Sequence, residues 1–219
     1  MSAECSADRA RVYRLLARTF QPPKPPRMDA IRREDLPELR AALERLGATP
    51  ELLGLAERVI ECLLDAGLAR LEREYDNAFE VSSGAARPPN ETAHVSETPQ
   101  EALTRTYELA DIAGFYRAFG VEVEPGSECV DHIAAELEFM HLLAVKEAIA
   151  KARDQTDKAE ICHDGAASFL RDHLGRWCAK FCARLQAENG GQLYQAAGEL
   201  LVQFVKLDIE DRKPPCRMA

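Results

Sequence analysis

Apolar side chains recur at helical spacing along nearly the whole chain, and the alternation of apolar and polar residues that marks a β-strand is almost absent. Ala, Leu, Glu and Arg dominate the composition, and all four are good helix formers. We find no repeat of fixed period, so a solenoid is disfavoured. The sequence therefore predicts an all-α fold, a single compact helical domain of about eight to ten helices over residues 1–219.

Proline and glycine divide the pattern into segments of helical length. The first predicted helix is capped by Ser6 or Asp8 and has an inward face. The helix holding the polar motif described below begins at 128 with Ser127 as its cap, and Gly175 is expected to break the chain before Trp177. The helical pattern covers residues up to 20, 28–46, 50–66, 68–79, 99–119, 128–151, 157–173 and 193–209, and the inward face of the first segment is Val12, Leu15, Leu16 and Thr19.

One long irregular stretch, residues 81–98, is rich in turn-forming residues. A loop of this length inside a compact domain is usually either functional or disordered. We favour the functional interpretation.

The chain is acidic, with 28 Lys and Arg against 37 Asp and Glu and a formal net charge of −9. This balance disfavours nucleic acid and an anionic membrane surface as partners. It permits attraction to a basic peptide, although acidity can also serve solubility alone. No apolar run reaches the roughly 18 residues of a membrane span, and the first 20 residues do not form a secretory signal. Seven cysteines without a C-x-x-C pair indicate reduced thiols in a cytoplasmic protein.

Glu128, His132 and Glu136 stand four residues apart, which would place them on one face of a helix. Ionisable groups beside a core face are costly unless they are hydrogen-bonded or used. The stripe is either an acid/base unit or a structural network at a helix start, and spacing alone favours the structural network.

Signatures of nucleotide binding and hydrolysis are absent from the sequence. One metal pattern remains, because Glu-x-x-His occurs at Glu91–His94 and again at Glu138–His141. Di-metal helix bundles use two such pairs. A helix-bundle di-metal oxidoreductase is therefore the alternative function, although one pair lies in the irregular stretch.

Tyr75 and Phe79 lie on one predicted helical face directly before the irregular stretch. Such a pair commonly belongs to the core. Its position also suits the wall of a binding pocket.

The central motif resembles that of the TorD/DmsD/NarJ-like chaperones, which mature molybdenum-cofactor oxidoreductases in the cytoplasm. The motif residues are Glu128, Asp131, His132, Glu136, Leu137, Phe139 and Met140. Weaker matches follow in the family's order at residues 13–17 with Phe20, 74–79 with the prolines at 88 and 89, 169–177 with Phe181, and Tyr194 with Ala196.

The resemblance implies an all-α chaperone that is not an enzyme and has no cofactor and no metal site. It implies binding to the catalytic subunit of a molybdopterin-dependent reductase or dehydrogenase through its twin-arginine leader, before export. It implies a monomer, with a dimer by helix exchange as the alternative. The family's leader- or client-binding positions correspond to Tyr75, Phe79, Glu128, Asp131 and His132.

The chain departs from the family's pattern at two places. Cys129 stands where the family usually has proline, and residues 90–94 lack the loop's usual aromatic residues. The loss of the loop aromatics indicates a divergent branch with a particular client. The sequence names neither the client enzyme nor the part of it that is recognised.

Overall fold

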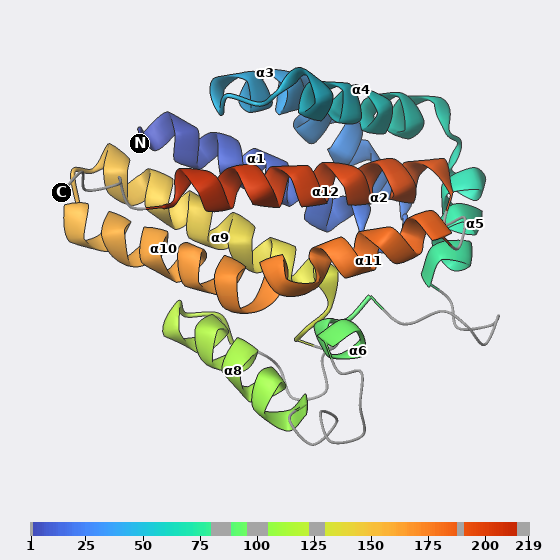
Figure 1. Cartoon of the computed structure of the whole chain (residues 1–219). Coiled ribbons are helices and arrows are strands. Elements are labelled where there is room, and N and C mark those ends of the chain that lie inside the picture. Colours follow the sequence, from blue (N-terminus) through green and yellow to red (C-terminus); the bar gives the residue numbers. More distant parts are fainter. Residues whose placement is uncertain (1, 80–88, 96–104, 123–129, 188–190, 214–219) are drawn as a thin grey trace.

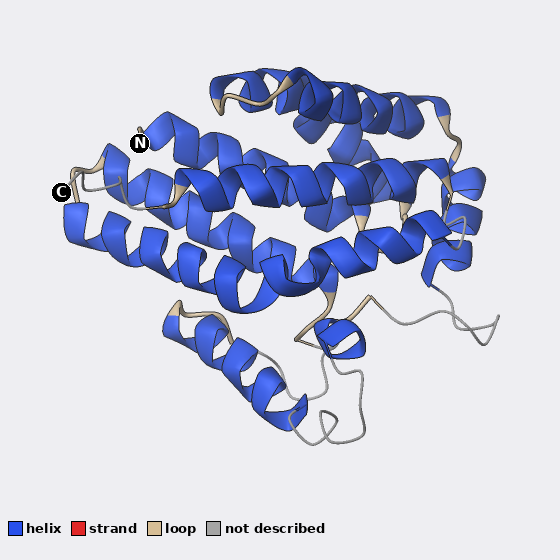
Figure 2. Ribbon diagram, viewed as in Figure 1, coloured by secondary structure: helices blue, strands red, loops and turns tan. Residues whose placement is uncertain are grey.

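The computed structural model describes residues 2–79, 89–95, 105–122, 130–187 and 191–213, and all regular elements in these ranges are helices (Figures 1 and 2). A single antiparallel bridge between Asn90 and His132 is the one strand-like pairing among them. The predicted all-α fold is confirmed. The helices are α1 (Ala3–Thr19), α2 (Pro25–Ala30), α3 (Leu36–Arg45), α4 (Pro50–Asp65), α5 (Leu68–Phe79), α6 (Glu91–Val95), α8 (Arg105–Ala118), α9 (Ile133–Ala152), α10 (Thr156–Phe169), α11 (Gly175–Ala187) and α12 (Gln192–Asp211), with π-helical turns at Ile31–Asp35 and Leu170–Leu174.

Helices α1 and α9 pack along each other in the middle of the bundle. The predicted inward face of α1 is buried, and α1 begins earlier than predicted because the Ser2 side chain caps it by accepting from the Cys5 amide at 3.2 Å. Helix α10 packs against α9, while α12 packs against α4 and α11 (Figure 1). The start of α1 meets the end of α12, where Arg9 Nε and Tyr13 Oη each donate to Asp208 at 2.6 Å.

The predicted break at Gly175 is wrong. The turn Leu170–Leu174 leads directly into α11, which begins at Gly175. A Cβ at position 175 would lie 2.3 Å from the carbonyl oxygen of Leu170 and 3.2 Å from Ile209 Cδ1. Glycine is needed here for a close approach inside the helical run, not to end a helix.

Helices α6 and α8 lie outside the main bundle, below α10 and α11 in the view of Figure 1. Aromatic side chains attach α8 to the bundle. The rings of Phe115 and Phe169 are 5.4 Å apart, and those of Tyr116 and Phe139 are 4.7 Å apart. Polar side chains of α6, α8 and the Leu170–Leu174 turn therefore meet beside the bundle.

Candidate functional site

Asp131 lies just before α9 and is fully buried. Its carboxylate accepts hydrogen bonds from Asn90 Nδ2 at 2.9 Å and from the amide and hydroxyl of Thr92 at 3.1 and 2.6 Å. These charge-assisted bonds are stronger than neutral ones. Asp131 therefore holds the start of α6 against the start of α9.

Backbone pairing reinforces this attachment. The Glu91 amide donates to the Asp131 carbonyl at 2.9 Å, and the Ile133 amide donates to the Pro89 carbonyl at 2.8 Å. His132 caps α9, because its Nδ1 accepts from the Ala134 amide at 3.1 Å. In this structure His132 thus stabilises a helix terminus.

The helix predicted to begin at 128 instead begins at Ile133, so this boundary is wrong. Residues 130–132 form a turn and the isolated bridge, since the His132 side chain takes over the capping role expected of Ser127. His132 and Glu136 consequently do not share a stripe within one helix. Glu128 lies outside the described residues.

Glu136 is fully buried in the first turn of α9, and its Oε2 accepts from Trp177 Nε1 at 3.1 Å. Burial and the nearby charge of Glu91 raise the pKa of Glu136 well above its usual value. The structural interpretation of this carboxylate is therefore supported, because it joins α9 to α11 through the indole.

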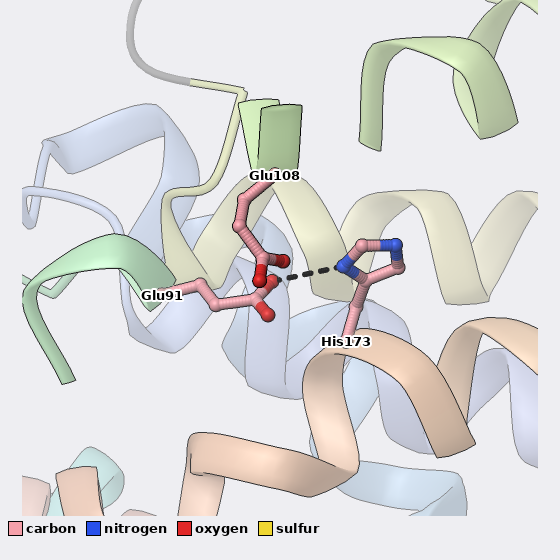
Figure 3. A group of neighbouring side chains, drawn as sticks. All are labelled: Glu91, Glu108 and His173. Carbon is pink, nitrogen blue, oxygen red and sulfur yellow. Dashed lines mark hydrogen bonds and ion pairs between the residues drawn. The ribbon is translucent and has the colours of Figure 1, made fainter. Parts of the chain in front are cut away.

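Glu91, Glu108 and His173 come together from α6, α8 and the Leu170–Leu174 turn (Figure 3). His173 Nδ1 lies 3.2 Å from Glu91 Oε2, and its Nε2 lies 3.2 Å from Asp111 Oδ2. Burial lowers the pKa of His173, but the hydrogen bond and charge of Glu91 and the charge of Asp111 outweigh it, so the pKa is raised. Arg176 Nη1 approaches Glu108 at 3.3 Å and Glu91 at 3.8 Å.

Tyr75 and Phe79 lie on α5 and belong to a group of aromatic rings. Their own centroids are 4.8 Å apart, and Phe79 packs at 5.0 Å from Tyr194 and at 6.2 Å from Phe181. Phe79 is buried, whereas Tyr75 is half-buried and packs against the edge of the core. The pair therefore extends the core to the surface of α5.

The ring contacts continue from α5 to α6. His94 of α6 stacks on Trp177 with centroids 5.3 Å apart and lies 5.7 Å from Phe181, which itself contacts Phe79. The structure thus joins the predicted aromatic pair and the predicted Asp131–His132 pair through α6 and α11, without a direct contact between the two pairs among the interactions described.

Several central residues were not predicted as site residues from the sequence: Glu91, His94, Glu108, His173 and Trp177. The signals in the sequence were the Glu-x-x-His spacing of Glu91 and His94, the functional interpretation of the irregular stretch, and the family match at residues 169–177, which includes His173 and Trp177. Part of that stretch, Glu91–Val95, is helical. Glu108 carries no local signal, and the match at residues 169–177 does not indicate that His173 lies beside it, because the fold alone brings the two together.

The second Glu-x-x-His pair has different neighbours. Glu138 is exposed and bonds to Gln21, while His141 Nδ1 lies 2.8 Å from the Ala10 carbonyl. Among the described residues, only the Glu91, Glu108 and His173 group brings three potential ligands close enough to share an ion. The di-metal arrangement built from two Glu-x-x-His pairs is therefore wrong.

Across the described ranges, no helix combines the length and the apolar character that crossing a lipid bilayer requires.

A family model described as nitrate reductase delta subunit matches residues 26–183 of the chain. The selenate reductase assembly chaperone protein of Thauera selenatis is 35% identical over 145 residues, which cover 64% of this chain and 72% of that relative. The chaperone protein TorD of Photobacterium profundum is 28% identical over 177 residues, covering 78% of this chain and 79% of that relative.

The perchlorate reductase assembly chaperone protein of Dechloromonas aromatica is 31% identical over 122 residues. That match covers 55% of this chain and 51% of the relative, so it spans about half the length of that relative. The resemblance seen in the central motif thus extends well beyond it, over residues 26–183.

Proposed function

The chain belongs to the nitrate reductase delta subunit family, and on that premise we propose that it is an assembly chaperone, not an enzyme, for the catalytic subunit of a molybdenum-cofactor reductase. It binds the twin-arginine leader of that subunit in the cytoplasm and delays export until the cofactor is inserted. The names of the relatives, which assemble perchlorate, selenate and other reductases, support the client class.

The observation that carries leader binding is the aromatic pair at the surface of α5. Tyr75 is half-buried and rests on Phe79, which is itself packed on Tyr194. A leader has an apolar middle segment, and burying each CH₂ contributes about 0.8 kcal/mol. An edge of the core that reaches the surface suits such a segment better than a polar helix face would.

The charge of α5 also favours leader binding at this surface. Two acidic residues of α5, Glu72 and Asp76, are exposed on the helix that carries Tyr75, and the chain as a whole has a net charge of −9. Carboxylates near an apolar site would attract the arginine pair and increase the association rate. We expect the apolar contacts to supply most of the affinity and the carboxylates to set orientation.

Asp131 contributes indirectly in this proposal. Its carboxylate is enclosed by Asn90 and Thr92, so it holds α6 in place and leaves contact with the client to neighbouring side chains. His132 is only half-buried, which keeps it a candidate for direct contact. No cofactor is required, and a monomer is sufficient for binding.

The test is calorimetry of the purified chain with synthetic leader peptides of the molybdenum reductases encoded by its host. We expect one leader to bind, and binding to weaken when both of its arginines are replaced by glutamine. A scrambled peptide of equal composition serves as the control. Equal affinity for the native and scrambled leaders would contradict leader recognition.

A further inference from the structure

Three potential metal ligands meet beside the bundle, each from a different element. Glu91 opens α6, Glu108 lies on α8 and His173 lies in the Leu170–Leu174 turn, with one donor atom of each within 4.8 Å of the others (Figure 3). We propose that these residues form a site for a divalent transition-metal ion of borderline softness, such as Zn²⁺ or Co²⁺. The site goes beyond the proposed chaperone function.

Burial makes the group more than an exposed acidic cluster. Glu91 is 0% exposed and His173 is 1% exposed. The neighbours of the Glu91 carboxylate include Arg176 Nη1, 3.8 Å from Oε1, and the carboxyl group of Glu136, which hydrogen-bonds to Glu91. Burying a carboxylate is costly, and a cation bound to the group would offset that cost.

The donor geometry suits such an ion. Two ligands bonded to a tetrahedral Zn²⁺ lie about 3.4 Å from each other, given bonds of roughly 2.0–2.1 Å. His173 Nδ1 and Glu91 Oε2 are already 3.2 Å apart. One imidazole nitrogen and two carboxylates match the ligands that Zn²⁺ and Co²⁺ accept, and leave a position for water.

Asp111 lies close to where the outer partner of a metal-binding histidine would be. It lies on α8 three residues after Glu108, and its Oδ2 is 3.2 Å from His173 Nε2, an ion-pair distance without hydrogen-bond geometry. A histidine that binds a metal through one nitrogen commonly donates its other N–H to a carboxylate, which fixes the ring. The ring is therefore oriented with Nδ1 toward Glu91 and Nε2 toward Asp111.

Arg176 is the competitor of the ion. Its Nη1 lies 3.3 Å from Glu108 Oε2, it also donates to the Asp172 carbonyl, and its side chain is 41% exposed. A surface hollow of about 600 Å³, lined by Glu108, Asp111 and Arg176 among others, opens beside the group. Metal binding would move the Arg176 guanidinium toward this hollow, and the ion would then neutralise the carboxylates of Glu91 and Glu108 in its place.

A bound ion would join α6 and α8 to the Leu170–Leu174 turn. Helix α8 lies outside the main bundle and is attached chiefly by aromatic contacts. An ion that binds only the folded arrangement raises stability by mass action. Metal binding is therefore expected to raise the midpoint temperature of unfolding.

The experiment uses the full chain, purified without a tag, stripped with a chelator and kept reduced. Co²⁺ is the probe, followed by visible absorption and calorimetry, with Zn²⁺ added to displace it. We expect one Co²⁺ per chain without the intense near-ultraviolet band of thiolate ligation. Zn²⁺ should displace it and raise the unfolding temperature.

Four variants test the assignment. Glu108→Gln should weaken Co²⁺ binding by more than about tenfold, and Asp111→Asn by about tenfold through the outer shell. Arg176→Gln should strengthen binding, which a purely structural ion pair would not do. Glu199→Gln is the matched control, because Glu199 is a partly exposed glutamate paired with Arg58, and it should leave binding unchanged.

Three results would overturn the proposal. The first is absence of stoichiometric Co²⁺ binding by the unmodified chain. The second is unchanged affinity in folded Glu108→Gln, with folding checked by circular dichroism. The third is a strong thiolate band, which would place the ion on cysteines instead.

Discussion

The hydroxyl of Thr92 donates a hydrogen bond of 2.6 Å to the carboxylate of Asp131, although 39 residues separate them in the chain. The same carboxylate accepts from the Thr92 amide and from Asn90. A short helix of five residues, α6, is therefore attached to the bundle by a buried acid and not by its own length. Helices this short are unstable without tertiary contacts.

Replacing Asp131 with alanine should lower the free energy of unfolding by about 2–4 kcal/mol, because it leaves buried donors of Asn90 and Thr92 without an acceptor. Urea denaturation followed by circular dichroism measures the change. Asp164→Ala, an exposed position on α10, is the control. Equal losses in both variants would show that the buried hydrogen bonds contribute nothing measurable.

Replacing Tyr75 with alanine should weaken leader-peptide binding by about tenfold or more, through lost apolar area and lost ring contacts. Tyr107→Ala is the matched control, since Tyr107 is 78% exposed on α8, away from the α5 rings. Calorimetry measures both affinities. If the two variants bind equally well, the aromatic pair on α5 is not the leader site.

Stability should fall in acid through Glu147. Burial raises its pKa, but the hydrogen bond from His163 and the charges of Arg212 and Lys151 outweigh this and lower the pKa to about 2. Because the folded pKa lies below the unfolded value, the unfolded state binds the proton first. The contribution, about 3 kcal/mol, is present above about pH 4.5 and is lost as the pH falls toward 2.

Glu147→Gln isolates this effect. The variant should be less stable than the unmodified chain near neutral pH, and the difference should shrink below about pH 4.5. Glu160→Gln, an exposed glutamate on α10, should show no such convergence. Urea midpoints measured across this pH range decide the matter, and a constant difference would be inconsistent with a lowered pKa.

Gly175→Ala should destabilise the protein by about 1–3 kcal/mol, because the new methyl group would overlap the Leu170 carbonyl oxygen. Gly114→Ala on α8 is the contrasting substitution. A Cβ there would meet no atom within 4 Å beyond its chain neighbours and the backbone of its own helix, so helix propensity should make the change neutral or stabilising by up to about 1 kcal/mol. Thermal unfolding compares them, and similar shifts would refute the steric argument.

Local patterns predicted the helices well where one apolar face meets the core. The segments predicted at 50–66 and 68–79 have the boundaries that proline, glycine and periodicity indicate, whereas the segment predicted at 28–46 begins at Pro25 and is divided by the Ile31–Asp35 turn. The start of α9 was misplaced because its cap is a histidine whose backbone also pairs with Asn90. The sequence around residue 132 does not indicate that pairing.

The candidate site was predictable only in part. Tyr75 and Phe79 share a helical face, and that geometry follows from a spacing of four. Glu91 and His173 are 82 residues apart, so their contact depends on the tertiary fold. Gly175 was misinterpreted for a related reason: its close neighbour Ile209 belongs to another helix.

The indole of Trp177 is the only one in the chain, and it lies where α6, α9 and α11 meet, stacked on His94 and bonded to Glu136. Its fluorescence emission is therefore a built-in reporter of that junction. Departure of α6 would uncover one face of the ring and shift the spectrum to longer wavelength while the remaining helices stay folded. Rapid-mixing fluorimetry could then time the movement of a five-residue helix without any added dye.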